Sequence, residues 1–386
     1  MRTSVRTARA ERTVPAVGGV DLPLLLIAAA LVAFGCVMVY SASSVYAEQY
    51  HHDRGYFIVR HLVFLVLSVA VAAVAVRFAT PRFWADAGVL LYGASVVMLL
   101  LVLAVGSDLG SGAKRWLDFG FITVQPSEIT KTALVLVLAR YMAENRDRIA
   151  ARRGSFRYGV LYPAILIVIP LALVALEKHI SGLMILGMIG LAVMFLGGTR
   201  LRWILSILAV IAAAGTLLIL LFPYAQARVD TWLRIEQADP LGSAWQTLQG
   251  LMAIGSGGLF GRGLGNSYQK YGYVSQPQND FIFTIVCEEM GFFGAALVIL
   301  LFALFVWRGF RVARYAGNAT ASLIAYGLTF KVALQAAMNV AVVTNSMPNT
   351  GISLPFFSYG GTSLLLQIFE VGILLSISRY STQTKL

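Results

Sequence analysis

Long hydrophobic segments alternate with polar connections along almost the whole chain. A helix that crosses the hydrocarbon core of a membrane needs about 20 mainly apolar residues. Ten segments meet this requirement: 22–42, 56–76, 83–105, 126–143, 157–176, 181–198, 202–223, 280–306, 318–342 and 360–379. The pattern therefore predicts an all-α polytopic membrane protein with about ten transmembrane helices. Because ten is an even number, both termini are expected on the same side of the membrane.

The same pattern suggests a simple domain organisation. Residues 1–21 are predicted to be a polar tail, and residues 22–386 a single ten-helix membrane domain. The long loop 224–279, between the seventh and eighth predicted helices, combines helical periodicity with tryptophans and a glycine cluster. A large structured loop of this kind commonly carries function.

Basic residues gather in every second connection. They are Arg2, Arg6, Arg9, Arg12, Arg77, Arg82, the run from Arg140 to Arg157, Arg200, Arg202, Arg308, Arg311, Arg314, Arg379 and Lys385. Arginine and lysine next to membrane helices favour the cytoplasmic side. Both termini are therefore predicted to be cytoplasmic, and the segments 106–125, 224–279 and 343–359 to lie outside.

The composition supports a membrane protein and excludes other classes. Of 386 residues, 58% are hydrophobic and 12% are charged, whereas about a quarter of the residues in soluble domains are charged. The net charge of +12 is spread between apolar segments, which explains it by topology and argues against nucleic-acid binding. Cys36 and Cys287 are interpreted as buried small residues, and the four histidines lack metal-ligand spacing.

The segment "PQNDFIFTIVCEEMGF" (277–292) places three carboxylates in an apolar stretch. An acid at the centre of a membrane helix costs about 2.5–3.5 kcal/mol on insertion scales and is commonly functional. Asp280 is expected at the outer mouth of a helix, where a helix cap is the alternative interpretation. On a continuous helix, Glu288 would lie loosely on the same side, about 12 Å along the axis. Glu288 and Glu289 are too deep for capping, so we expect them to face a cavity or to pair with a cation.

A second polar stretch, "GAKRWLDFGFITVQPSEITK" (112–131), joins an outer loop to a span. Pro126 and Glu128 fit the first turn of a helix for structural reasons. Lys131, one turn further, needs a partner or a watery cavity, with snorkelling as the alternative. Trp116 is either an interfacial tryptophan or a platform for a sugar or lipid head group.

Three further stretches carry weaker signals. The glycines of "GSGGLFGRGLGN" (255–266) lack the strand and the spacing of a nucleotide-binding loop, so close backbone packing is the better interpretation. Glu177 to His179 is either a wet turn or the mouth of a cavity. The Pro- and Gly-rich segment "MPNTGISLPFFSYGGTS" (347–363) predicts irregular backbone that is buried or lines a cavity.

Five blocks of sequence, spread along the chain, match a known family in the same order. They are "VMVYSASS" (38–45), "KRWLDFGFITVQPSEITK" (114–131), "LMAIGSGGLFGRGLGNSYQK" (251–270), "NDFIFTIVCEEMGFFGA" (279–295) and "TGISLPFFSYGGTSLL" (350–365). In these blocks the chain resembles the SEDS family of bacterial cell-wall proteins (shape, elongation, division and sporulation), most closely its FtsW and SpoVE branches.

The resemblance implies a multi-pass protein of the bacterial cytoplasmic membrane that polymerises glycan strands from lipid II at the outer face. It also implies a class B penicillin-binding transpeptidase as partner, undecaprenyl-diphosphate-linked glycan as a bound species, and contact with other division or elongation proteins. Asp280 matches the essential acid of the family, and Trp116, Lys131 and Glu177 match further positions. In "EKHISG", Lys178 stands where relatives commonly have proline, which puts the local geometry around Glu177 in doubt.

The implied chemistry assigns roles to the polar residues. Asp280 would be the general base that deprotonates the acceptor hydroxyl. Cations would hold the diphosphate, with a divalent ion (Mg²⁺ or Mn²⁺) as an open addition. The candidates for binding the substrate are Lys114, Arg115, Trp116, Lys131, Glu177, Arg262, Lys270 and Ser358. Glu288 and Glu289 would pair with an intramembrane cation such as Lys331 or shape the cavity.

Two other classes of function remain open from the sequence alone. A transporter would flip the lipid-linked precursor, but this function would not explain the large structured outer loop. A non-catalytic scaffold for division proteins would not need the intramembrane acids.

Overall fold

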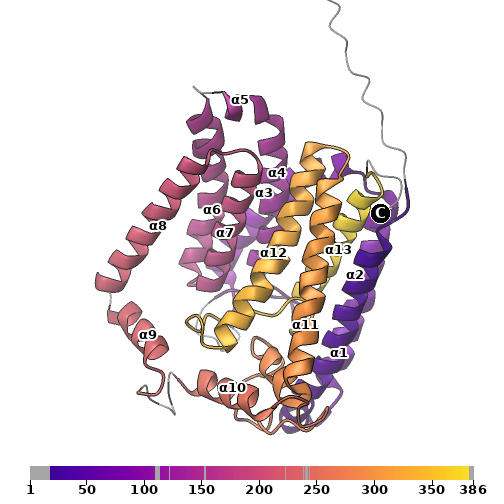
Figure 1. The fold of residues 1–386 in the computed structure, drawn as a ribbon, viewed down its shortest axis with the longest axis vertical. Helices are drawn as coiled ribbons and strands as arrows, with labels where there is room; N and C mark the ends of the chain where they lie inside the picture. The colour runs from indigo at the N-terminus through magenta and orange to yellow at the C-terminus, as the bar shows by residue number, and fades with distance from the viewer. Residues whose placement is uncertain are drawn as a thin grey trace, which may run out of the picture.

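Helices occupy all ten segments that the hydrophobic pattern selects (Figure 1). The structure is a computed structural model that describes residues 18–108, 114–120, 122–151, 154–221, 223–237, 239, 242 and 244–381. The helices on the predicted spans are α1 (Leu22–His51), α2 (Tyr56–Phe78), α3 (Pro81–Val105), α4 (Pro126–Glu144), the π-helical turn η1 (Arg157–Leu161) continued by α6 (Tyr162–Leu176), α7 (Ile180–Leu196), α8 (Leu201–Leu221), α11 (Ile282–Arg314), α12 (Ala319–Val343) and α13 (Gly361–Ser378). The predicted all-α fold is confirmed.

Smaller elements fill the connections. They are α5 (Arg146–Ala150), α9 (Pro223–Leu233), α10 (Trp245–Ser256), β1 (Leu117–Asp118) and β2 (Thr123–Val124). Within the described residues, seven helices are long and apolar enough to cross a membrane, and α7 and the apolar part of α8 are shorter. The 19-residue α4 carries Glu128, Lys131 and Arg140, so composition alone is a weaker indication of a span there.

Helix starts follow local capping chemistry. Asp21 caps α1 by accepting a hydrogen bond from the Leu24 amide at 2.9 Å, and Asn318 caps α12 in the same way through the Ala321 amide at 2.8 Å. Such caps satisfy amides that have no partner inside the helix. The N-terminal segments of several helices also contain proline, whose fixed φ and missing amide suit the first turn.

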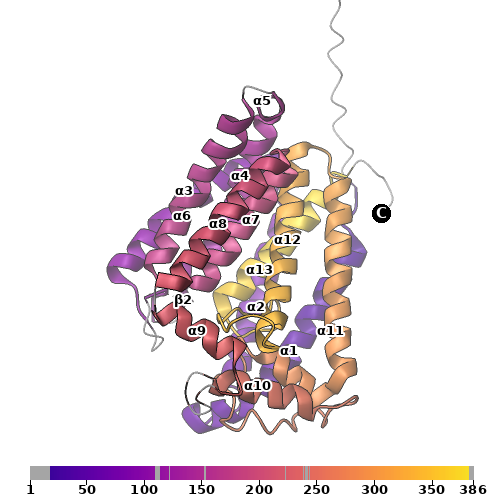
Figure 2. The same cartoon turned by 60° about the vertical axis from the view of Figure 1, so that its left-hand side comes forward.

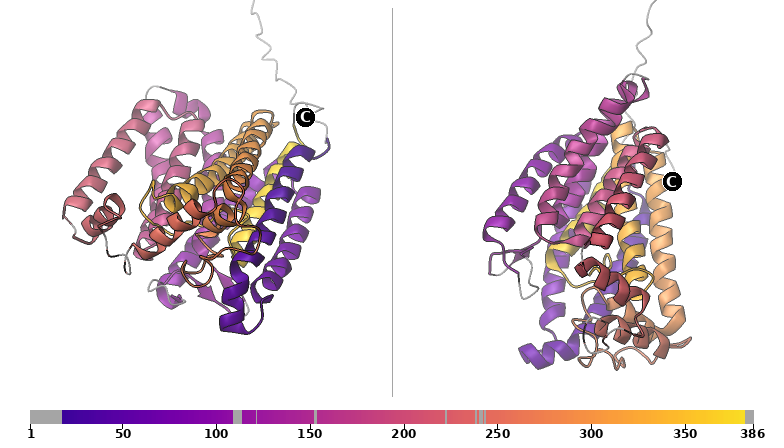
Figure 3. Two further views of the ribbon diagram at one scale, coloured as in Figure 1. Left: turned by 60° about the horizontal axis from the view of Figure 1, so that its bottom comes forward. Right: turned by 90° about the vertical axis from the view of Figure 1, so that its left-hand side faces the viewer.

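The helix α4 occupies the centre of the bundle and is buried along most of its length. It packs against α3, α7 and α12, while α13 packs against α2, and α11 lies between α12 and α1. Figure 1 shows α8 leaning away from the other helices, and Figures 1 and 2 show α9 and α10 following it at one end of the bundle. The connection 224–279 gathers at that same end (Figure 3). The helices of this predicted outer loop therefore lie together at one end of the molecule.

The helix α11 is broken at Gly291, which has φ 64° and ψ −160°. The glycine-rich segment packs into this break, where the Phe292 amide donates to the Gly258 carbonyl at 2.9 Å and the Arg262 amide to the Glu288 carbonyl at 3.0 Å. A Cβ on Gly261 would lie 2.2 Å from the Glu289 carbonyl oxygen. The prediction of close backbone packing by these glycines is confirmed. The prediction of one continuous helix through 280–306 is wrong, because residues 282–290 form a separate short helix.

Replacing Gly291 with alanine is expected to destabilise the protein by roughly 1–3 kcal/mol from backbone strain alone, since its φ and ψ suit only glycine. The added methyl would also lie 2.4 Å from the Gly261 amide nitrogen. Thermal unfolding in detergent measures the change. Gly255→Ala is the matched control, because nothing lies within 4 Å of its Cβ position and alanine favours the helix α10. Equal unfolding temperatures for the two variants would contradict the role of Gly291.

Candidate active site

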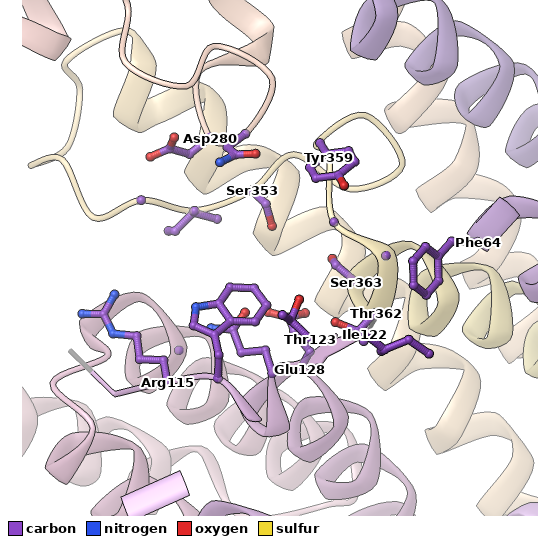
Figure 4. Close-up of a pocket in the computed structure, with 18 of the residues that line it drawn as sticks. Phe64, Arg115, Ile122, Thr123, Glu128, Asp280, Ser353, Tyr359, Thr362 and Ser363 are labelled. Atoms are coloured by element: carbon purple, nitrogen blue, oxygen red, sulfur yellow. The ribbon is translucent and has the colours of Figure 1, made fainter. Parts of the chain in front are cut away.

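A large pocket opens at the end of the bundle where the predicted outer loops meet. Its volume is about 860 Å³, and its lining comes from α2, α4, α7, α12 and α13 and from three loops that precede or follow them. In Figure 4, Asp280 and Ser353 lie on one wall, and Arg115 and Glu128 lie on the facing wall. We call this cavity the Asp280 pocket. It brings together described residues of the segments 106–125, 224–279 and 343–359, which the sequence predicts on one side of the membrane.

Asp280 lies in the loop immediately before α11, where neighbouring polar groups fix its backbone. The buried Asn339 side-chain amide donates to the Asp280 carbonyl at 2.7 Å and to the Ile352 carbonyl at 2.6 Å. Burial raises the pKa of the Asp280 carboxyl from 3.8 to about 6, although a bond from its own backbone amide offsets part of the effect. A carboxylate with a pKa near 6 can act as a general base near neutral pH.

Glu128 and Lys131 form a buried ion pair on the facing wall. The Lys131 Nζ lies 2.6 Å from Glu128 Oε1, and the two side chains are 2% and 9% exposed. Both residues line the Asp280 pocket. Because α4 begins at Pro126, Glu128 falls in its first turn and Lys131 three residues later. Lys131 therefore has both an acidic partner and a cavity, and snorkelling to the helix end is excluded.

A short β-hairpin brings Arg115 and Trp116 to the pocket. The strands β1 and β2 pair antiparallel with Leu117 opposite Val124, and Trp116 forms an isolated bridge with Ser107. Both Arg115 and Trp116 line the Asp280 pocket. The Arg115 guanidinium also donates to the Lys178 carbonyl at 2.7 Å, which ties the hairpin to the turn between α6 and α7.

Glu177 caps the end of α6 beside this contact. It is 2% exposed, and within the described part of the chain neither carboxylate oxygen has a hydrogen-bond partner. Burial raises the pKa of Glu177 to about 7, and the nearby Arg115 charge opposes this shift. Lys178 adopts φ 55°, which proline cannot adopt. The turn in this chain therefore differs from one that contains proline.

Five of the predicted substrate-binding residues lie outside the described lining of the Asp280 pocket, and their binding roles stay predictions. They are Lys114, Glu177, Arg262, Lys270 and Ser358. Lys114 is exposed, and the Arg262 guanidinium sits over the Tyr268 ring, 4.6 Å from its centroid. The Ser358 hydroxyl donates to the Asn279 carbonyl at 2.6 Å and accepts from the Leu354 amide at 2.7 Å. Ser358 thus supports the loop that carries Asp280.

Glu288 and Glu289 bind the long loop rather than the predicted intramembrane cation. Glu289 pairs with Lys270 at 3.1 Å and accepts a hydrogen bond from the Ser41 hydroxyl of α1 at 2.6 Å. Glu288 accepts from the Ser267 hydroxyl at 2.5 Å and from the Tyr268 amide at 2.9 Å. The expected pairing with Lys331 is wrong, because Lys331 pairs with Glu370, and the diphosphate-binding role of Lys270 stays a prediction. The two acids instead fasten the loop 263–271 to α11 and α1.

Replacing Glu289 with glutamine is expected to lower the free energy of unfolding by about 3 kcal/mol or more, because it leaves the buried Lys270 ammonium without a counter-ion. Thermal or denaturant unfolding in detergent measures the loss. Glu48→Gln is the matched control, since the Glu48–Arg54 pair is 52% and 71% exposed and should contribute at most about 1 kcal/mol. Similar losses in both variants would show that Glu289 does not support the loop.

The structure adds residues that the sequence did not select. Arg60 of α2 lines the pocket and stacks over Tyr56 at 4.3 Å from the ring centroid. Its position inside an apolar span was the signal that could have identified it. His179 also lines the pocket, and its Nδ1 lies 3.2 Å from the Ser127 hydroxyl. Burial and nearby cations lower the pKa of His179 to about 4, so it is neutral at pH 7.

The described residues offer no group of three or more histidine, cysteine, aspartate or glutamate side chains placed to hold a metal ion. The Mg²⁺ or Mn²⁺ ion stays an untested expectation, and no step is assigned to it.

These features define a multi-pass membrane protein with a polar pocket at one end of its helix bundle. The FtsW/RodA/SpoVE family model, described as "cell cycle protein", matches residues 22–383. The chain is 38% identical over 367 residues to stage V sporulation protein E of Bacillus subtilis, covering 94% of this chain and 97% of that protein. The chain therefore belongs to the FtsW/RodA/SpoVE family, and the resemblance to SEDS proteins is confirmed.

Other relatives agree with this assignment. The chain is 38% identical to a probable peptidoglycan glycosyltransferase FtsW of Trichlorobacter lovleyi, and the match covers 93% of each chain. A solved chain from a study titled "Structural coordination of polymerization and crosslinking by a peptidoglycan synthase complex" aligns with a TM-score of 0.78 at 27% identity, covering 94% of this chain and 99% of that one. The crystal structure of Thermus thermophilus RodA aligns with a TM-score of 0.69 at 27% identity, covering 94% and 98%.

Proposed function

We propose that this chain is a peptidoglycan glycosyltransferase that polymerises lipid II into glycan strands, for cell division or sporulation. The observation that carries the proposal is the Asp280 pocket, in which a carboxyl group of raised pKa shares one cavity with Arg60, Arg115 and Lys131. A lipid-linked sugar diphosphate has the two groups that such a pocket suits, a hydroxyl to deprotonate and a diphosphate to stabilise. The FtsW relatives, which are named as probable peptidoglycan glycosyltransferases, support the same activity.

In the proposed reaction, the Asp280 carboxylate accepts the proton of the acceptor sugar hydroxyl as that oxygen attacks the anomeric carbon of the donor. The bond from this carbon to the diphosphate oxygen breaks, and the diphosphate leaves with the bonding electrons. Arg60, Arg115 and Lys131 stabilise the negative charge that develops on it. Trp116 offers an aromatic face and an indole N–H donor to the sugar or lipid head group.

The membrane placement follows from the basic connections. They support cytoplasmic termini and an Asp280 pocket at the outer face of the bacterial cytoplasmic membrane. A class B penicillin-binding transpeptidase is the proposed partner, and the peptidoglycan synthase complex named for a structural neighbour supports a partner of this kind. Lipid II and undecaprenyl-diphosphate-linked glycan are the proposed bound species, and other division or elongation proteins are proposed to assemble with the pair.

Purified protein in liposomes with labelled lipid II as the sole substrate tests the activity. A glycan polymer that depends on this chain supports the proposal. Movement of lipid II between leaflets without polymer would indicate a transporter, and neither result would indicate a scaffold.

The rate of polymerisation is expected to rise about tenfold per pH unit below pH 6 and to level off above it. Only ionised Asp280 can accept a proton, and the pKa of its carboxyl is raised to about 6. Initial rates between pH 4.5 and 8 at saturating lipid II measure the profile. Glu177→Gln is the control, because it removes the nearby group whose pKa is about 7 and should leave the rise near pH 6. A profile flat from pH 4.5 to 7 would contradict Asp280 as the base.

A further inference from the structure

Three buried polar side chains meet beneath the Asp280 pocket, where three helices cross the middle of the bundle. Glu370 Oε1 of α13 accepts hydrogen bonds from the Thr132 hydroxyl of α4 and the Lys331 ammonium of α12. Thr132 is 0% exposed, and Lys331 and Glu370 are each 1% exposed. We call these three residues the deep triad. No role in the proposed reaction has been assigned to them.

Helix periodicity connects the deep triad to the pocket lining. Residues four or seven apart in an α-helix share a face. Thr132 lies four residues after Glu128 on α4, and Lys331 lies four residues before Gln335 on α12. On α13, Glu370 lies seven residues after Ser363. Glu128, Gln335 and Ser363 all line the Asp280 pocket. The deep triad is therefore the next polar layer below the pocket on each of the three helices.

Packing alone does not explain an ion pair at this depth. Lys331 is the midpoint of α12 (Ala319–Val343) and Glu370 lies near the middle of α13 (Gly361–Ser378). Charged groups at the centre of membrane helices are costly. Replacing a buried ion pair with apolar side chains of similar volume is often neutral or stabilising. Stability alone therefore gives no reason for a charged pair at these two positions.

The electrostatic arrangement indicates what the pair does. Lys331 attracts Glu128, and Glu370 attracts Lys131, while the two lysines repel each other. His179, just before α7, is the further titratable group close to Glu128 and Lys131, and it adds no charge at pH 7 because its pKa is lowered to about 4. The Glu128–Lys131 pair and the Lys331–Glu370 pair thus form one balanced group of four charges. The Thr132 hydroxyl bond joins α4 to this group within one turn of Lys131.

We propose that the deep triad is a positioning site that fixes α4 so that the Lys131 ammonium stays at the floor of the Asp280 pocket. This inference rests on the proposed function, because Lys131 is one of the groups assigned to the leaving diphosphate. Lys331, Glu370 and Thr132 act through Lys131 and Glu128 and do not touch the substrate.

The first test replaces the ion pair by apolar side chains, Lys331→Met with Glu370→Leu. The melting temperature should be equal or higher, whereas polymer turnover per folded molecule should fall at least tenfold at saturating lipid II. Arg308→Gln is the control, because it breaks a buried ion pair with Asp21 at the other end of the bundle, where the two atoms lie 2.8 Å apart. That variant should melt earlier and keep its turnover per folded molecule.

A second pair of variants keeps the test informative if the double variant does not fold. Thr132→Val preserves shape but removes the hydroxyl, and Thr132→Ser preserves the hydroxyl. Turnover should fall severalfold in the valine variant and recover in the serine variant. Equal turnover in the two, or wild-type turnover in the apolar double variant, overturns the proposal.

Amide hydrogen exchange provides a readout that does not depend on catalysis. Exchange in residues 126–134 of α4 should rise in the apolar double variant and in Thr132→Val, and should stay unchanged in Arg308→Gln. Unchanged exchange in the first two variants overturns the positioning role whatever the turnover. If the wild-type protein makes no polymer, the proposed function fails, and the exchange result still decides whether the deep triad positions α4.

Discussion

Asp280→Asn is expected to lower the turnover of glycan polymerisation by about 10²-fold or more, in line with the loss of a general base. Asparagine has nearly the size of aspartate, and the bonds that fix this loop run through the Asp280 carbonyl and the Asn279 carbonyl. The substitution should therefore leave the loop, the pocket and the melting temperature almost unchanged. Turnover per folded molecule in liposomes, with lipid II as the sole substrate, is the decisive measurement.

The matched control is Asp118→Asn in the β-hairpin. Asp118 is exposed and accepts a hydrogen bond from the Gly120 amide at 2.8 Å, which an asparagine oxygen can also accept. This variant should polymerise lipid II at the wild-type rate. The Asp280→Asn profile should also lose the rise below pH 6. Near-normal turnover by Asp280→Asn would remove Asp280 from the base role and leave it a structural residue of the loop.

The helices of this protein could be predicted from the hydrophobic pattern because a membrane imposes a minimum apolar length. The pattern located α4 although its first turns carry Glu128 and Lys131. It could not show the break at Gly291, because a glycine in an apolar segment can either continue a helix or interrupt it. Only the contact with another part of the chain shows which of the two occurs. That break depends on Gly261 reaching the α11 backbone from a loop 30 residues away in sequence.

The sequence could predict those residues of the candidate site that lie next to the ends of the predicted spans. Asp280, Arg115, Trp116 and Lys131 meet in one pocket because each stands just before, or just inside, a span at the same end of the bundle. The number of residues between a side chain and the end of its membrane span indicates how deep that side chain lies in the bundle. Residues at similar depths near the same end of the bundle are therefore candidates for one site.

The contacts of residues in the long loop could not be predicted in this way, because the loop lies outside the spans. Lys270 and Arg262 are as polar as the pocket residues, but the path of the loop directs Lys270 to Glu289 and Arg262 to Tyr268. Asn339 was missed for a related reason, since an amide in the middle of a helix becomes informative only when the Asp280 and Ile352 carbonyls are seen beside it.

Lys131→Met is expected to lower turnover by about 10²–10³-fold, because it removes a cation held ready where negative charge develops on the leaving diphosphate. The single variant also leaves Glu128 buried without its partner 2.6 Å away, so some loss of stability should accompany it. The double variant Lys131→Met with Glu128→Gln removes both charges and should recover most of the melting temperature. Its turnover should stay as low as that of the single variant. Recovery of turnover together with stability would mean that Lys131 only maintains the fold of α4, and the diphosphate would then depend on Arg60 and Arg115 alone.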